Sequence, residues 1–276
     1  MKTALGVAVA LLLALLATAS AAELRLAALF SDHMVLQRAK PVLVWGWAAP
    51  STTITVIRYT KRGVLWYQGE HNAGRALEYR ELLPVLIHSW REASGQPDLP
   101  FVIVQLPAYG HPEAELNWPV LRESQWFAQR STPNTALVVT IDHGERDNIH
   151  PADKREVGER LALETRRLVY GEAVTGCGPL YDGCSVEGAK LIVRFKGLGS
   201  GLRAAQGKPL AGFTISGDDR RFFPAEAEIV GDTVVLHSPQ VASPVAARYA
   251  WAGFPQVGLF STEGLPAGPF RTDDWK

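Results

Sequence analysis

The chain has no excess of either charge. Its 28 Lys and Arg residues balance its 28 Asp and Glu residues, and no basic run stands out. Proteins that bind nucleic acid or anionic membrane surfaces usually carry a basic patch. We therefore expect neither kind of partner. The 276 residues are still enough for a sizeable core and more than one small domain.

Long apolar runs are missing except at the N-terminus. Residues 4–17 are mostly Ala, Leu and Val, Lys2 precedes them, and the small residues 19–22 come before the first acidic residue, Glu23. This is the layout of a cleavable secretory signal. The rival interpretation is a membrane anchor, but the run is short for a bilayer span of roughly 20 residues. We predict a signal peptide at 1–22, a secreted or periplasmic location, and no membrane partner after cleavage.

Cysteine is scarce: the chain has two, Cys177 and Cys184, on either side of a Gly/Pro-containing stretch. In an oxidising compartment such a pair indicates a local disulfide. A metal site would need more ligands than this stretch offers. We therefore predict a Cys177–Cys184 disulfide.

The mature chain divides into three regions of different pattern. Residues 23–60 carry short β-like runs at 42–45 and 52–57, separated by Pro and Gly. Residues 63–172 alternate strand and helix. Residues 178–274 are β again, with Gly231-Asp232 as a hairpin turn between runs at 227–230 and 233–236. We predict an N-terminal β segment, an α/β domain and a C-terminal β domain with these bounds.

The α/β region has apolar strands that are buried on both sides. The predicted strands are 64–67, 101–106 and 136–141, and the predicted helices are 78–93, 118–130 and 153–170. Continuous apolar strands alternating with helices indicate a parallel sheet covered on both faces. Functional residues of such sheets lie beyond the carboxyl ends of the strands. That rule selects residues 68–72, the segment after Leu106, and residues 142–150.

The segment after the third predicted strand contains Asp147 and, three residues later, His150. A carboxylate that orients an imidazole makes a general base, which takes the proton of a nucleophile. The pattern alone is weak, because Asp and His are common in surface loops. Two alternatives stay open: a purely structural loop, and a metal site made of His143, Asp147 and His150.

The segment after the first predicted strand is Gln68-Gly69-Glu70-His71-Asn72. Its glycine permits close backbone approach, and the Gln68 and Asn72 amides are donors suited to an oxyanion. By composition alone, a helix-capping turn explains these residues equally well.

Several blocks, in the same order along the chain, are similar to the signatures of the sialate O-acetylesterase family. They are residues 30–38, 41, 45–48, 63–70, 99–101, 104–106, 147–151, 248–251, 264–267 and 270–273. The resemblance implies an SGNH-type hydrolase that removes acetyl groups from sugars with a Ser-His-Asp triad and no cofactor or metal. It implies that Asp147 and His150 are the catalytic base pair and that Gln68, Gly69 and Glu70 line the oxyanion side. The fold it implies is an incomplete SGNH-like parallel three-layer α/β sheet, flanked by N-terminal and C-terminal β-sandwich-like segments.

The chain departs from that family in two places. The family has Ser where this chain has His71, and its nucleophile block Gly-Gln-Ser-Asn-Met occurs nowhere in the chain. The N-terminal β segment instead runs through residues 59–62 directly into Gly63, which suggests an internal deletion there. Adjacent side chains diverge, which argues against a triad of Ser31, Asp32 and His33. The remaining candidate serines lie in a turn, in predicted helices or at helix ends: Ser51, Ser89, Ser94, Ser124 and Ser131.

Three hypotheses follow from the sequence. The first is an impaired or inactive sialate O-acetylesterase-like enzyme whose inherited substrates are acetylated sugars or glycans, with His71 as a substitute nucleophile or water activator left open. The second is a non-catalytic carbohydrate-binding protein that uses the β regions and some of its eight Trp residues. The third is the product of a damaged gene. Loss of the first strands would also leave a sheet edge unpaired, so we expect self-association through that edge.

Overall fold

The computed structural model describes residues 25–26, 46–48 and 61–275, and contacts divide the chain into two compact units, 1–60 and 61–276. In the first unit, β1 (Arg25–Leu26) pairs antiparallel with β2 (Gly46–Trp47). Some predictions lie outside the described residues: the signal peptide, the strands at 42–45 and 52–57, the Ser31–Asp32–His33 sequence and Ser51. Among the described helices, none has the length and apolar character that crossing a membrane requires.

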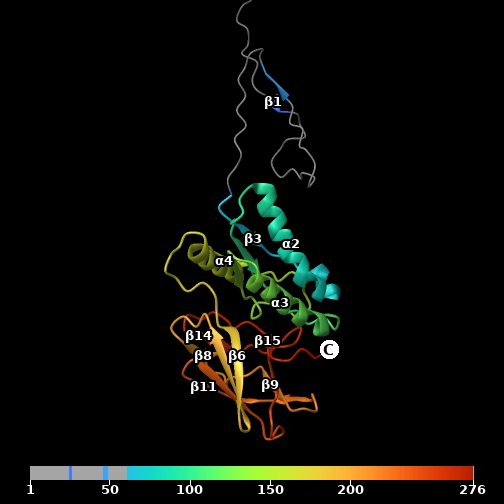
Figure 1. The fold of residues 1–276 in the computed structure, drawn as a ribbon, viewed down its shortest axis with the longest axis vertical. Helices are drawn as coiled ribbons and strands as arrows, with labels where there is room; N and C mark the ends of the chain where they lie inside the picture. The colour runs from blue at the N-terminus through green and yellow to red at the C-terminus, as the bar shows by residue number, and fades with distance from the viewer. Residues whose placement is uncertain (1–24, 27–45, 49–60, 276) are drawn as a thin grey trace, which may run out of the picture. The chain divides into compact units, whose positions relative to one another are not determined.

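The second unit opens with a parallel sheet of order β3-β4-β5 (Figure 1). Its elements are β3 (Val64–Trp66), η1 (Glu70–Arg75), α2 (Ala76–Ser94), β4 (Phe101–Val104), α3 (Ala114–Ser131), β5 (Thr135–Val138) and α4 (Arg155–Leu168). Every residue of β4 and β5 is buried. Helix α3 packs on β5, α4 packs on both β4 and β5, and α2 packs against α3. The predicted parallel, doubly covered sheet is confirmed.

Antiparallel sheets follow. One has the order β11-β12-β7-β6 and the other β10-β9-β13-β15, and β8 pairs with β14. Their strands are β6 (Leu180–Glu187), β7 (Lys190–Lys196), β8 (Leu202–Ala204), β9 (Phe213–Ser216), β10 (Phe222–Pro224), β11 (Glu226–Val230), β12 (Thr233–His237), β13 (Ala246–Tyr249), β14 (Leu259–Ser261) and β15 (Phe270–Arg271). The predicted hairpin is confirmed: Val230 pairs with Thr233, and Gly231 has the positive φ (58°) that a tight turn favours.

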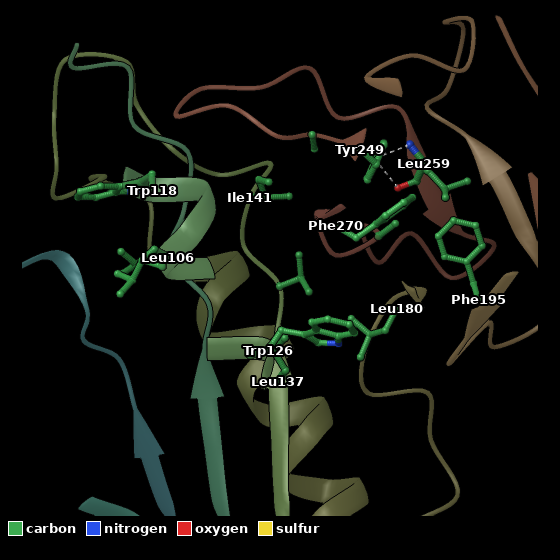
Figure 2. Packing of buried hydrophobic residues seen from close by; sticks show 14 of the residues in the cluster. Leu106, Trp118, Trp126, Leu137, Ile141, Leu180, Phe195, Tyr249, Leu259 and Phe270 are labelled. Carbon is green, nitrogen blue, oxygen red and sulfur yellow. Dashed lines mark hydrogen bonds between the residues drawn. The ribbon is translucent and has the colours of Figure 1, made fainter. Parts of the chain in front are cut away.

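One hydrophobic core runs through both halves of the second unit (Figure 2). Trp126 of α3 lies 6.3 Å from Tyr181 of β6, between ring centroids, and Tyr181 stacks on Phe270 of β15 at 4.7 Å. Phe270 in turn lies 6.0 Å from Tyr249 of β13. This chain of rings packs the C-terminal sheets on the α/β layer. The domain boundary predicted between 172 and 178 stays a prediction.

Arg122 of α3 joins the two halves through hydrogen bonds and is fully buried. Its guanidinium donates to the carbonyls of Leu106 (2.9 Å) and Pro107 (2.7 Å), beyond β4, and of Ala252 and Gly253 (both 2.9 Å), beyond β13. Burial lowers the pKa of Arg122 to about 9, which still leaves the group charged near neutral pH.

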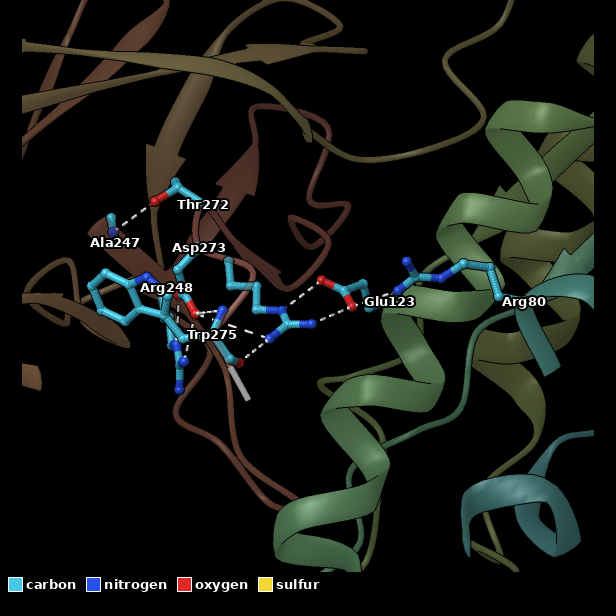
Figure 3. A network of polar contacts seen from close by, with 8 residues as sticks. Arg80, Glu123, Ala247, Arg248, Thr272, Asp273 and Trp275 are labelled. Atoms are coloured by element: carbon cyan, nitrogen blue, oxygen red, sulfur yellow. Dashed lines mark hydrogen bonds and ion pairs between the residues drawn. The ribbon is translucent and has the colours of Figure 1, made fainter. Parts of the chain in front are cut away.

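A second polar connection centres on Glu123, the neighbour of Arg122 in α3 (Figure 3). Its carboxylate accepts hydrogen bonds from Arg80 of α2 at 2.8 Å and from Arg271 of β15 at 2.8 and 3.0 Å. Arg122 and Glu123, consecutive residues of α3, therefore each connect the α/β half to the antiparallel region, through different partners.

We predict that Arg122→Met lowers the free energy of unfolding by about 3–5 kcal/mol, because four carbonyls lose a charged donor. The carbonyls of Pro107 and Gly253 each keep one further, neutral donor. Urea unfolding followed by tryptophan fluorescence measures it. Arg130→Met on the same helix is the control, since Arg130 is exposed and its guanidinium stacks on Trp126 without bonding these carbonyls. Equal unfolding midpoints for the two variants would show that Arg122 does not join the halves.

Candidate functional site

The segment that follows β3 and the segment that follows β5 meet at the carboxyl edge of the parallel sheet. They enclose a pocket of about 420 Å³. Its lining comprises Tyr67, Glu70, His71, Ile149, His150 and Lys154. Both segments were selected from the sequence as functional, and the structure brings His150 together with Glu70 and His71. Gln68, Gly69, Asn72 and Asp147 do not line this pocket.

A hydrogen-bond network fixes Gln68, the chain neighbour of the lining residue Tyr67. The Tyr79 hydroxyl accepts a hydrogen bond from Trp66 Nε1 at 3.1 Å and donates one to Gln68 Oε1 at 3.0 Å. Burial raises the pKa of Tyr79 to about 12, so the phenol remains a donor. Gln68 Nε2 donates to Asn72 Oδ1 at 2.9 Å. One of the two N–H groups of Gln68 Nε2 is thus used, and Asn72 Nδ2 has no hydrogen-bond partner among the described residues.

Gly69 sits against helix α3, where a side chain would crowd its neighbours. A Cβ at this position would lie 2.9 Å from Leu121 Cδ2 and 3.3 Å from Gln125 Nε2. The Gly69 N–H donates to Glu70 Oε2 at 2.9 Å. With Glu70 in this position, the Gly69 N–H is not free to bind an oxyanion.

The loop that carries His150 is anchored where it leaves β5. Asp142 accepts two hydrogen bonds from Arg160 of α4, at 2.6 and 2.7 Å, and Arg160 also donates to the Val139 carbonyl at 2.8 Å. His143 Nε2 lies 3.5 Å from Asp142 Oδ2 and 3.9 Å from Glu156 Oε2. His143 therefore turns toward α4 instead of joining His150 at the pocket.

Glu145 fixes the far end of the same loop. Its Oε1 accepts from the Ala152 N–H at 2.6 Å and its Oε2 from Asn148 Nδ2 at 3.1 Å. Asn148 Oδ1 in turn accepts from the His150 N–H at 3.0 Å. The hydrogen bond from Ala152 and then that from Asn148 lower the pKa of Glu145. Sequence reasoning did not select Glu145, since its acceptor role depends on the fold of the loop.

Asp147 is exposed, and so is His150. Within residues 61–275, no hydrogen bond or ion pair joins the Asp147 carboxylate to the His150 imidazole. Their pairing as a catalytic base therefore stays a prediction. Among the described residues, no group of three or more His, Cys, Asp and Glu side chains is arranged to hold a metal ion.

Tyr67 and Lys154 are lining residues that sequence reasoning did not select. Lys154 Nζ donates to the Pro151 carbonyl at 2.6 Å and lies 5.7 Å from the Tyr67 ring centroid. Burial, and then the negative charge of Glu70, raise the pKa of Tyr67 to about 12. Tyr67 is thus a protonated hydroxyl at neutral pH. The position of Tyr67 immediately after β3 was the signal that could have identified it.

No serine is among the lining residues of this pocket. Ser89, Ser94, Ser124 and Ser131 all lie in helices α2 and α3, as expected from the sequence. The structure therefore supplies no hydroxyl nucleophile from the described candidates.

The predicted disulfide is not formed: Cys177 and Cys184 are both free. Cys177 Sγ lies against Gly197, just past the end of β7, whereas Cys184 pairs with Val193 inside that strand. Four residues of extended strand separate these positions by about 13 Å, well beyond the reach of a disulfide. Extended pairing of β6 with β7 replaces the tight loop that the sequence suggested.

We predict that Glu145→Ala speeds hydrogen exchange of the Ala152 amide about tenfold, because that N–H loses its acceptor. The pKa of Glu145 is lowered, so the bonded ionised form persists above this depressed pKa and the contact is lost as pH falls through it. Exchange measured by NMR tests the effect. Glu159→Ala, which removes an exposed partner of Arg155, is the control and should leave the Ala152 amide unchanged.

Comparisons with known proteins agree with this arrangement. A sequence model of the family "carbohydrate esterase, sialic acid-specific acetylesterase" matches residues 48–167. The sialate O-acetylesterase of Mus musculus is 31% identical over 240 residues, and that of Homo sapiens is 30% identical over 241. Each alignment covers 76% of this chain, but only 44% and 46% of the respective relative.

A solved structure is also similar. The crystal structure of a novel carbohydrate acetylesterase from Xanthomonas citri matches with a TM-score of 0.74 and 42% identity, over 78% of this chain and 51% of that one. The chain thus spans about half the length of the proteins it matches. With its parallel sheet and its pocket at the strand ends, the chain belongs to the sialate O-acetylesterase family of carbohydrate esterases.

Proposed function

We propose that this chain is a carbohydrate esterase that acts on O-acetyl groups of sugars, with turnover that is strongly reduced or lost. The observation that carries the proposal is that His150 and the Glu70–His71 segment open into one pocket at the carboxyl edge of the sheet. The relatives named as sialate O-acetylesterases and as a carbohydrate acetylesterase support the substrate class. The proposed site needs no cofactor.

In the proposed reaction His150 is the general base, and Asp147 orients it. A base at this position takes a proton from water, and the resulting hydroxide attacks the acetyl carbonyl. The protonated imidazole then returns the proton to the departing sugar oxygen, which releases acetate and the free sugar hydroxyl. The Tyr67 hydroxyl, which lines the pocket, is the donor proposed for the developing oxyanion. His71 is the alternative water activator or nucleophile.

Reduced turnover is expected because no serine lines the pocket. In serine hydrolases, removal of the nucleophile lowers turnover by several orders of magnitude, and binding plus oxyanion donors retain a residual rate. The internal deletion near residues 59–62 stays a prediction. The genomic sequence around those codons tests it: an intact nucleophile block there would show that the chain as given is incomplete.

We expect His150→Ala to lower hydrolysis of an O-acetylated sugar at least tenfold relative to the unchanged chain, measured by acetate release. His71→Ala in parallel reports whether the second imidazole activates water. Exposed imidazoles hydrolyse activated esters without a site, so His88→Ala, an exposed histidine on α2, is the matched control. Hydrolysis that survives His150→Ala and His71→Ala equally would exclude this pocket as the site.

A second candidate function is non-catalytic carbohydrate binding. It is favoured by a pocket in the C-terminal sheet with Trp251 in its wall. Saturable glycan binding without any acetate release would support this candidate. If neither turnover nor glycan binding is detected, the remaining hypothesis is that the chain is the product of a damaged gene. In either functional case we propose an exported protein, on the strength of the N-terminal 22 residues.

We further propose that the free edge of β3 pairs with a second copy of the chain. Among the described strands β3 has one neighbour, β4, and Leu65 at its centre is 56% exposed. An unpaired edge with an exposed apolar residue promotes strand addition, and a lysine there opposes it.

We predict that Leu65→Lys shifts the chain from dimer toward monomer in light scattering coupled to size exclusion, over a series of protein concentrations. Tyr170→Lys, which replaces another exposed apolar side chain beyond α4, is the control and should not change the mass. A monomer at all concentrations for the unchanged chain would contradict the proposal.

A further inference from the structure

The sheet β10-β9-β13-β15 has one face in the core and one face outside it. Its register places Pro224 opposite Thr214 and Thr214 opposite Arg248, so these side chains share a face. Phe213 and Tyr249, the adjacent residues, point to the other face and are buried in the core. The outer face contributes to a pocket of about 520 Å³, which is within the ordinary size range of small-ligand sites.

A backbone distortion brings Trp251 to this outer face. Strand alternation from Tyr249 would direct residue 251 toward the core side. Ala250, however, has a positive φ of 48°, rare for a residue with a Cβ, and its N–H donates to the Gly212 carbonyl at 2.9 Å. The turn buries Ala250 and lets Trp251 line the pocket beside Arg248. Strain of this kind persists where the surrounding structure or a function requires it.

Arg248 forms the floor of the pocket with its charge already balanced. Its Nε and Nη2 donate to Asp273 at 2.8 and 2.7 Å, and the Asp273 side chain is only 1% exposed (Figure 3). The Arg248 guanidinium carbon lies 4.1 Å from the centroid of the Phe222 ring, which forms one wall of the pocket. Arg248 Nη1 has no hydrogen-bond partner among the described residues. Nη1 is thus a spare donor on a lining residue whose charge is paired with Asp273.

Two further polar side chains of the lining are unpaired within residues 61–275. The Thr214 hydroxyl and the Gln256 amide make no side-chain hydrogen bond, and both residues contribute to the wall. The pocket thus combines two aromatic side chains, Phe222 and Trp251, with a hydroxyl, an amide and a guanidinium N–H.

We propose that this pocket binds an uncharged pyranose residue of a glycan, apart from any catalysis. Aromatic walls suit the apolar C–H faces of a pyranose, and the amide, hydroxyl and guanidinium groups suit its ring hydroxyls. Arg248 is paired with Asp273, which also lies 3.9 Å from Arg271, and Arg271 is paired with Glu123. Both arginines thus have carboxylate partners, which disfavours a strongly anionic ligand. The inference deepens the carbohydrate-binding candidate given above and does not rest on the proposed esterase activity.

The segment that walls this pocket also contacts the loop that carries His150. The Arg146 guanidinium lies 4.8 Å from the ring centroid of Phe254, and the Gly253 carbonyl accepts a hydrogen bond from the Tyr109 N–H at 2.9 Å. Trp251 and Gln256 of the same segment line the sugar pocket. A glycan held here would therefore lie next to the segment that supports the candidate esterase loop.

Isothermal titration of the whole chain with soluble neutral oligosaccharides, namely N,N′-diacetylchitobiose, xylobiose and lactose, tests the proposal. We expect saturable binding of at least one of them, about tenfold weaker in Trp251→Ala. Thr214→Val keeps the side-chain shape and should weaken binding severalfold, while Trp251→Phe should retain most of it. Tyr170→Ala, which removes an exposed aromatic side chain that is not among the lining residues, is the control and should bind normally.

Circular dichroism and thermal melting of each variant separate loss of binding from loss of fold. No saturable binding to any of the three sugars, or equal binding by folded Trp251→Ala, would overturn the proposal. Binding confined to carboxylated sugars such as galacturonate, with affinity that falls as salt rises, would overturn the uncharged class. Acetate release measured on the same variants reports on the esterase proposal separately, so the two can fail independently.

Discussion

The buried guanidinium of Arg122 is the contact on which the arrangement of residues 61–275 depends. From one position in α3 it bonds the carbonyls that follow β4 and the carbonyls that follow β13. Those carbonyls belong to irregular segments, which have no strand partners to satisfy them. A cation with donors in several directions satisfies all of them at once. Glu123, the next residue, adds the ion pairs to Arg80 and Arg271, and the aromatic contacts of Trp126 complete the attachment.

The candidate site is built at the same junction. Helix α4 anchors the start of its loop through Arg160 and Asp142, and Glu145 fixes the end through Asn148 and Ala152. The opposite wall follows β3, where the hydroxyl of Tyr79 fixes Gln68. The pocket contains two imidazoles and a phenol donor, and no serine lines it. The absence of a serine is the reason why the proposed esterase activity is a reduced one.

The C-terminal sheet contributes more than a cover for the core. Its inner face supplies Tyr249 and Phe270 to the hydrophobic cluster, and its outer face presents Arg248 and the displaced Trp251. The segment after β13 then contacts Arg122, Tyr109 and Arg146 in turn. One short segment therefore links the core junction, the loop of His150 and the proposed sugar pocket.

The sequence by itself determined the parallel sheet, its helices and the two strand ends that form the candidate site, because apolar periodicity and strand-end position are local signals. It also determined the family, through blocks spread along the chain. Boundaries shifted where packing overrode local signals: α3 begins at Ala114, before the predicted 118, since Trp118 is buried and bonds the Pro107 carbonyl. Only the tertiary structure decided that Glu145 fixes the loop, that Tyr67 and Lys154 line the pocket, and that Cys177 and Cys184 stay apart. These depend on contacts between residues distant along the chain, or on strand register, which no local pattern encodes.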